Sequence, residues 1–257
     1  MNSNNNTVLK VEGLGIDFGG LTAVDKFNIE VGKTDIVGLI GPNGAGKTTV
    51  FNMLTKVYKP SRGKIYLNGV STEKMTTIDV NKAGIARTFQ NIRLFNNLSV
   101  IDNVITGMHN HLSYNTFAGI MRLPSFYKEE RKARERAMEL LEIFNLADSA
   151  EIPAKSLPYG AQRRLEIARA LATEPCLLLL DEPAAGMNPI ETEELMNTIR
   201  LIRDKFQIAI LLIEHDMKLV MGVCEKITVL NFGQVLMCGS PEEVQSNPEV
   251  IKAYLGD

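Results

Sequence analysis

The chain has 257 residues, of which 45% are hydrophobic, and a formal net charge of −2. This length allows a sizeable core in one large domain or in two lobes. The charge gives no bulk basic signal for nucleic acid or for an anionic membrane surface, and no apolar run approaches the roughly 18 residues needed to span a bilayer.

The first part of the chain predicts a tail followed by short strands. Residues 1–7 are rich in Asn and Ser and lack an apolar stretch, so we expect a disordered tail and not a signal peptide. Apolar runs separated by glycines then predict strands over 8–11, 27–31 and 36–40.

The segment 41–48 matches G-x-x-x-x-G-K-[ST], the phosphate-binding loop of nucleotide triphosphatases. Its glycines permit tight or left-handed backbone angles, so several N–H groups can turn inward, and the following helix adds its N-terminus to this cradle. Lys47 can reach the β- and γ-phosphates, and the Thr48 hydroxyl can bind Mg²⁺. The expected nucleotide-binding residues are Gly41, Pro42, Asn43, Gly44, Ala45, Gly46, Lys47, Thr48 and Thr49.

A Gly-rich surface turn before a helix is the alternative interpretation of this loop. The context argues against it, because a strand-like run precedes the loop and apolar residues after it recur with the spacing of one helix face. These apolar residues are Val50, Met53, Leu54 and Val57. Strand, glycine-rich loop and helix in this order are the context that the motif requires.

Helical patterns dominate between about residues 91 and 172. Before this block, a strand over 64–67, an Asn68-Gly69 hairpin turn and a strand over 84–89 are expected. Inside it, 128–146 predicts a helix whose dense charge is interpreted as a solvated face, whereas 107–127 has no clear periodicity. The two histidines in that stretch, His109 and His111, are expected to be ordinary surface residues, because a metal site would need more ligands.

Strands and helices alternate again after residue 175. Strands are expected over 176–180, 208–213, 226–230 and 235–239, and helices over 189–204, 216–222 and 241–255. Continuous apolar runs fit parallel strands that are covered on both faces. Three cysteines, Cys176, Cys224 and Cys238, lack C-x-x-C spacing and predict buried thiols in a reducing compartment.

Two acidic residues follow four leucines at Leu177–Leu180. A buried parallel strand places the next residue at the carboxyl edge of the sheet, where ligands bind. Asp181 can hold Mg²⁺ there, usually through water, and Glu182 can point to the opposite side and polarise the water that attacks the γ-phosphate. The alternative for an isolated Asp-Glu pair is a solvated loop start.

Two further polar side chains follow predicted strands. His215 follows the apolar run 208–213, separated from it by Glu214, and could donate a hydrogen bond to the γ-phosphate. The alternative is a surface or capping residue, which a lone His at a strand end more often is. Gln90 could bridge Mg²⁺ and water, but an isolated Gln carries almost no signal.

Together these elements resemble the ATP-binding subunit of an ABC transporter over residues 8–256. The segment that distinguishes this family from other phosphate-loop enzymes is the signature, which here reads LPYGAQRRLEIARAL from Leu157 to Leu171. The resemblance implies an α/β phosphate-loop NTPase core, with a mixed sheet of parallel central strands and an antiparallel β subdomain, and an inserted α-helical subdomain. The implied divisions begin with a disordered tail over 1–7 and the first part of the nucleotide-binding core over 8–90. The helical subdomain with the signature follows over 91–172, then the second part of the core over 173–240 and a C-terminal helical segment over 241–257.

The resemblance also implies roles for individual residues. Phe18 lies where the family places an aromatic that stacks on adenine, Gln90 becomes a Mg²⁺ and coupling residue, and His215 becomes the switch that contacts the γ-phosphate. With Lys47 and Glu182, Gln90 and His215 complete the implied catalytic set, and the implied metal ligands are Thr48, Gln90 and Asp181. The residues expected to meet the ATP held by a partner subunit are Tyr159, Gly160, Ala161 and Gln162.

Three positions depart from the family pattern. Pro158 stands in place of the signature serine, so its hydroxyl contact to the γ-phosphate is absent. Ala161 replaces a frequent Gln or Gly, and Asn188 stands where the family often has Asp. We expect activity to persist, more slowly or with reliance on a partner's sequence.

A narrower likeness is to ATPases of branched-chain amino-acid importers. It is carried by ARTFQNIRLFNNLSVIDNV, LLLLDEPAAGMNP, LLIEHDMKLVMGV and the ending NPEVIKAYLGD. It implies a Mg²⁺-dependent ATPase, peripheral on the cytoplasmic face of the inner (plasma) membrane. The alternatives are another transporter ATPase, such as one for lipopolysaccharide export, and a soluble non-transport ABC ATPase.

The implied partners are integral membrane permease subunits, an external substrate-binding protein and a second ABC ATPase, in a homodimer or a heterodimer. No nucleic-acid partner is expected. The helical block 91–172 is expected to touch the membrane subunit.

Overall fold

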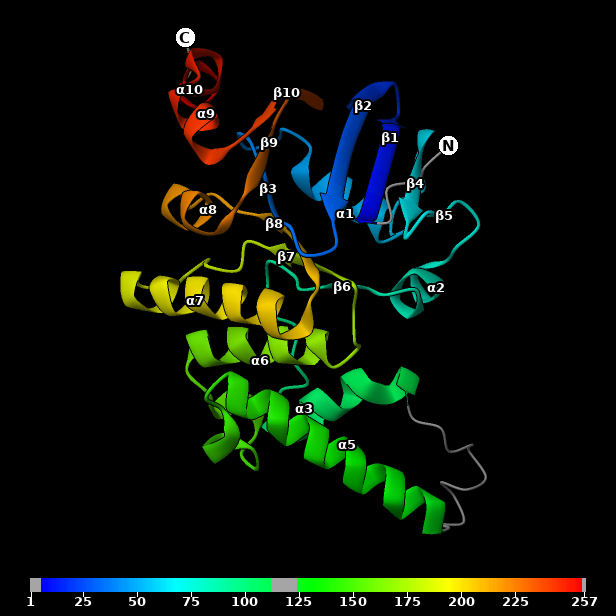
Figure 1. The fold of residues 1–257 in the computed structure, drawn as a ribbon, viewed down its shortest axis with the longest axis vertical. Coiled ribbons are helices and arrows are strands. Elements are labelled where there is room, and N and C mark those ends of the chain that lie inside the picture. Colours follow the sequence, from blue (N-terminus) through cyan, green and yellow to red (C-terminus); the bar gives the residue numbers. More distant parts are fainter. Residues whose placement is uncertain (1–5, 112–123, 256–257) are drawn as a thin grey trace. The chain divides into compact units, whose positions relative to one another are not determined.

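The computed structural model describes residues 6–111 and 124–255. The chain divides into two compact units, Met1–Gln90 with Cys176–Asp257, and Asn91–Pro175 (Figure 1). The prediction of a tail over 1–7 falls mostly outside the described residues, and the first strand already begins at Thr7.

The first unit contains a four-stranded antiparallel sheet in the order β2-β1-β4-β5. Its strands are β1 (Thr7–Phe18), β2 (Leu21–Gly32), β4 (Arg62–Leu67) and β5 (Val70–Ser71). β1 and β2 are longer than predicted. In β1 the reason is that Gly13 lies at a register shift within the β1–β2 ladder and does not end the strand. The predicted hairpin turn is confirmed: Asn68 and Gly69 join β4 to β5 with φ angles of 49° and 78°.

The same unit contains a six-stranded sheet in the order β10-β9-β3-β8-β7-β6, in which only β10 is antiparallel to its neighbour. The strands are β3 (Ile36–Ile40), β6 (Ile85–Arg87), β7 (Leu177–Asp181), β8 (Ala209–Ile213), β9 (Lys226–Asn231) and β10 (Gln234–Gly239). Every residue of β3, β7 and β8 is buried, as expected for central parallel strands. The carboxyl ends of β3, β6, β7 and β8 therefore share one edge.

The first unit also contains helices. They are α1 (Lys47–Leu54), α2 (Thr77–Lys82), α7 (Pro189–Phe206), α8 (Met217–Val223), α9 (Pro241–Ser246) and α10 (Pro248–Leu255). Of these, α9 and α10 follow the last strand. Asn188, one of the departures from the family pattern, caps α7: its Oδ1 accepts from the N–H groups of Ile190 and Glu191 at 2.9 and 3.0 Å.

The second unit is helical. Its elements are α3 (Val100–Gly107), η1 (Met108–His111), α5 (Pro124–Ile143), η2 (Ala147–Ser149), η3 (Ala154–Ser156) and α6 (Tyr159–Leu171). α5 begins before the predicted residue 128 and ends before 146. It buries Ala133, Ala137 and Leu141 on one face, while most of its charged side chains are exposed, as the predicted solvated face requires. Part of the unclear segment, residues 112–123, lies outside the described residues.

The prediction of three buried thiols is wrong for Cys238. This side chain is exposed on β10, an edge strand, whereas Cys176 is half-buried and Cys224 is buried. Burial raises the pKa of the Cys224 thiol to about 12. Within residues 6–111 and 124–255, no helix is both long and apolar enough to cross a membrane.

Candidate nucleotide-binding site

The loop between β3 and α1 has the backbone that a phosphate cradle requires. Gly41 has φ 152°, and a Cβ there would lie 2.0 Å from the Leu230 carbonyl oxygen, so only glycine fits. Gly46, with φ 105°, is the N-cap of α1. The first hydrogen bond of the helix runs from the Val50 N–H to the Gly46 carbonyl at 3.0 Å. The N–H groups of Lys47, Thr48 and Thr49 therefore precede the helical ladder and can bind an anion.

Lys47 is held inside this loop. Its Nζ donates to the carbonyl oxygens of Gly41 and Pro42 at 2.6 and 3.0 Å, and the residue is buried. Desolvation lowers the pKa of Lys47, while the carboxylates of Glu182 and Asp181 oppose that shift. The positive charge thus lies close to both acidic residues at the end of β7.

A pocket of about 580 Å³ lies over the loop and is large enough for a nucleotide. It brings seven of the nine predicted loop residues, Asn43–Thr49, together with Gln90, Glu182 and His215, whereas Gly41, Pro42 and Asp181 are not in its lining. Its lining comprises Leu21, Thr22, Ala23, Asn43, Gly44, Ala45, Gly46, Lys47, Thr48, Thr49, Gln90, Glu182, His215 and Phe232. Phe18 is not part of this lining among the described residues; its ring lies 5.3 Å from that of Tyr58.

Glu182 is the centre of a polar cluster in the pocket. Its Oε2 accepts from the Gln90 side-chain amide at 2.8 Å, and its Oε1 lies 2.9 Å from Nε2 of His215. Glu182 follows β7 with a left-handed φ of 48°, and its N–H donates to the Ile213 carbonyl of β8 at 2.9 Å. Three side chains that were predicted from separate strand ends therefore meet at one carboxylate.

The signature segment lies in the helical unit and begins α6. Pro158 is the N-cap and makes no side-chain capping bond. The Gln162 N–H donates to the Pro158 carbonyl at 2.9 Å, so it belongs to the helical ladder. The first-turn N–H groups that remain available to an anion are therefore those of Tyr159, Gly160 and Ala161. That Gln162 meets the ATP of a partner subunit stays a prediction.

Comparisons with known proteins decide the family. The family model described as "ABC transporter" matches residues 24–185. The chain is a member of the ABC transporter family. A second model, described as "Branched-chain amino acid ATP-binding cassette transporter", matches residues 234–257.

Relatives of this ABC cassette extend the match to nearly its whole length. It is 48% identical, over 97% of its length and 98% of theirs, to two high-affinity branched-chain amino acid transport ATP-binding proteins, BraF of Pseudomonas aeruginosa and LivG of Escherichia coli K12. It is 34% identical, over 97% of both chains, to the lipopolysaccharide export system ATP-binding protein LptB of Acidithiobacillus ferridurans.

A solved structure bears out the predicted fold class. The crystal structure of MJ1267, an ATP-binding cassette of an ABC transporter, in its ADP conformation, superposes with a TM-score of 0.85 at 29% identity, covering 98% of this chain and 99% of that one. The chain is therefore an α/β cassette that binds nucleotide, of the family that hydrolyses ATP.

The donor atoms of the cassette suit Mg²⁺. Thr48, Gln90 and Asp181 offer hydroxyl, amide and carboxylate oxygens, which are the hard ligands that this ion prefers, and one or two protein carboxylates suffice when a nucleotide supplies phosphate oxygens. In the described residues no group of three or more His, Cys, Asp or Glu side chains could hold a metal. The fit to Mg²⁺ rests on the oxygen donors of Thr48, Gln90 and Asp181, which would bind the ion together with phosphate oxygens of the nucleotide.

Two functional candidates in the cassette are not among the residues predicted from the sequence. Arg87, at the end of β6, places its NH2 group 2.6 Å from Oδ2 of Asp181. Phe232, in the β9–β10 turn, is 89% exposed at the pocket with a left-handed φ of 42°. The Asn-Phe-Gly turn was the available signal for Phe232, whereas a single Arg in a short strand carried none.

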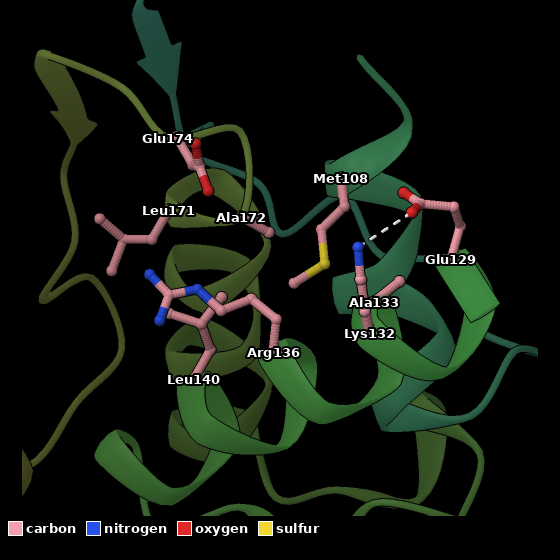
Figure 2. A pocket seen from close by; sticks show the side chains of 9 residues that line it. All are labelled: Met108, Glu129, Lys132, Ala133, Arg136, Leu140, Leu171, Ala172 and Glu174. Atoms are coloured by element: carbon pink, nitrogen blue, oxygen red, sulfur yellow. Dashed lines mark hydrogen bonds and ion pairs between the residues drawn. The ribbon is translucent and has the colours of Figure 1, made fainter. Parts of the chain in front are cut away.

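A hollow in the helical unit is too small for a nucleotide. It holds about 140 Å³, and its apolar lining includes Met108, Leu140 and Leu171. Charged side chains line the rest of it, including the Glu129–Lys132 pair at 3.1 Å (Figure 2). Since ligand pockets usually exceed about 300 Å³, the loop pocket of the first unit is the candidate nucleotide site.

Proposed function

We propose that this cassette binds and hydrolyses ATP to drive the uptake of branched-chain amino acids. The proposal is supported by the identity to BraF and LivG, which at 48% exceeds the 34% to LptB. The match of residues 234–257 to the branched-chain amino acid cassette model points the same way.

The loop Gly41–Thr49 binds the phosphates in this proposal. The N–H groups of Lys47, Thr48 and Thr49 lie at a helix N-terminus, where the helix dipole favours negative charge. Lys47 exchanges its two carbonyl acceptors for β- and γ-phosphate oxygens, which are stronger partners because they are charged. Phe18 stacks on adenine.

Glu182 is the general base. It lies in the same pocket as the phosphate loop, and its two carboxylate oxygens are fixed by Gln90 and His215, so a water between Glu182 and a bound γ-phosphate can be oriented for attack. When bound through Thr48, Gln90 and Asp181, Mg²⁺ supplies charge neutralisation at the phosphates. His215 senses the γ-phosphate by exchanging its bond to Glu182 for one to the phosphate.

The working assembly contains two cassettes and membrane subunits. The first-turn N–H groups of Tyr159, Gly160 and Ala161 contact the γ-phosphate of ATP bound to a second cassette, either a copy of this chain or a similar ATPase. The helical unit contacts integral permease subunits, and an external binding protein delivers the substrate. The cassette then lies peripherally on the cytoplasmic face of the plasma membrane.

Glu182→Gln tests the assignment of the base. Glutamine keeps the size and one acceptor of Glu182 but cannot take a proton, so ATP turnover should fall by about 10²–10⁴-fold. Binding of ATP to the loop should remain close to that of the unmodified protein. Glu193→Gln, an exposed position on α7, is the matched control and should keep full turnover. Near-normal turnover in Glu182→Gln would remove Glu182 from this role.

A further inference from the structure

We propose that Arg87 is a positioning residue for the metal site: it binds one oxygen of Asp181 and thereby fixes the direction in which the other oxygen meets Mg²⁺. Asp181 is the Mg²⁺ ligand only under the proposed function, so the role of Arg87 rests on that assignment.

The Arg87 guanidinium makes two short hydrogen bonds at once, besides a longer one of 3.5 Å from its NH1 to Oγ1 of Thr55. Its NH2 donates to Oδ2 of Asp181 at 2.6 Å, and its NH1 donates to Oδ1 of Asn52 at 2.7 Å. The described residues form no other hydrogen bond to the Asp181 carboxylate. Oδ2 is therefore taken by Arg87, and Oδ1 is the oxygen available to a metal ion.

The guanidinium is fixed by more than the aspartate. It makes cation–π contacts with two aromatic rings, with its central carbon 5.5 Å from the centre of Phe51 and 5.3 Å from that of Phe89. These rings and Asn52 fix the orientation of the planar guanidinium. Its hydrogen bond to Oδ2 then fixes the orientation of the Asp181 carboxylate. Only 8% of the Arg87 side chain and 5% of the Asp181 side chain are exposed.

Stability alone does not explain this pair. Ion pairs taken out of water gain little or nothing relative to apolar side chains of similar volume. The Arg87 Nε is also buried without a hydrogen-bond partner in the described part of the chain, which adds to the cost of burial. An ion pair that is costly for folding and that includes a predicted metal ligand, Asp181, is better explained by a functional requirement.

The position of Arg87 in the chain links three parts of the nucleotide site. Asn52 belongs to α1, the helix that begins with Lys47 and Thr48. Arg87 ends β6, three residues before Gln90, and Asp181 ends the neighbouring strand β7. One side chain thus ties together the segments that carry all three expected metal ligands.

Charge and direction can be separated by substitution. Lysine keeps a positive charge near Asp181, but its single ammonium lacks the planar fork that reaches Asn52 and Asp181 at fixed angles. If Arg87 only neutralises Asp181, Arg87→Lys is silent. If Arg87 orients Asp181, Arg87→Lys impairs the metal site selectively.

The experiment measures the ATP affinity of the full chain twice, once in EDTA and once in excess Mn²⁺ or Mg²⁺. The ratio of the second affinity to the first is the gain from the metal, and this ratio is compared between each variant and the unmodified protein. We expect Arg87→Lys to bind ATP in EDTA as the unmodified protein does, and to lower the gain from the metal by about tenfold, as loss of a hydrogen bond to a metal ligand commonly does. Electron paramagnetic resonance of Mn²⁺ bound with ATP should show the altered coordination. The control is Arg203→Lys, at an arginine that pairs with Asp204 and Glu225, and it should leave the ratio unchanged.

Two further variants keep the outcomes distinct. Asp181→Asn should abolish the gain from the metal; if it does not, the assignment of Asp181 itself fails. If Asp181→Asn abolishes the gain and Arg87→Lys leaves it intact, only the role of Arg87 is overturned. Should Arg87→Lys not fold, Asn52→Ala decides, because it removes one support of the guanidinium: a lowered ratio supports the proposal and an unchanged ratio overturns it.

Discussion

Gly41→Ala should disrupt the phosphate loop, and its effect can be worked out from the structure. The added Cβ would lie 2.0 Å from the Leu230 carbonyl oxygen, whereas real Cβ atoms essentially never come within 3.0 Å, so the loop and β9 must separate by about 1 Å. The φ of 152° adds backbone strain, because residues with a Cβ avoid positive φ. Strain of roughly 1–2 kcal/mol and overpacking of roughly 1–3 kcal/mol together lower the free energy of unfolding by about 2–5 kcal/mol.

Gly44→Ala is the matched control in the same loop. Its φ of 79° is also positive, but an added Cβ would meet nothing within 4 Å, so only the strain of about 1–2 kcal/mol applies. In a chain of this length each kcal/mol shifts Tm by roughly 2–4 °C. Thermal melts of both variants check this difference in stability. ATP binding should be weakened more in Gly41→Ala than in Gly44→Ala, because Lys47 donates a hydrogen bond to the Gly41 carbonyl. Equal melting temperatures for the two variants would refute the reasoning.

The remaining predictions concern a helix cap and two thiols. Asn188→Ala should lower the free energy of unfolding by about 1 kcal/mol in urea titrations, while Asn188→Asp keeps the cap and should be nearly neutral. Cys238 should react rapidly with a thiol reagent at pH 8 and Cys224 only after unfolding, because Cys238 is exposed and the pKa of Cys224 is raised to about 12. An unfolded thiol ionises near pH 9.0 and the folded one does not, so stability should fall as the pH rises from 9 towards 12, less steeply in Cys224→Ala.

The sheet-edge residues were predictable because their signals are local. Apolar runs identify parallel strands, and the carboxyl ends of such strands meet at one edge, so the sequence alone places Asp181, Glu182 and His215 near the phosphate loop. The bonds from Gln90 and His215 to Glu182 add the geometry that the pattern could not supply.

Contacts between distant segments could not be predicted. The role of Arg87 depends on α1, β6 and β7 packing together, and nothing local to Arg87 reports this. The exposure of Cys238 depends on β10 being an edge strand, which is a property of the sheet order. The predicted β1 is too short because a glycine usually marks a strand boundary, whereas Gly13, at a left-handed φ of 58°, lies at an irregularity within the ladder.

Uptake of labelled leucine tests the central claim most directly. Cells that lack this chain would be supplied with the unmodified protein, with Glu182→Gln or with Glu193→Gln, at equal expression. We predict that the unmodified protein and Glu193→Gln restore high-affinity leucine uptake and that Glu182→Gln does not. Uptake that is unaffected by loss of the chain, or that is restored fully by Glu182→Gln, would contradict the account.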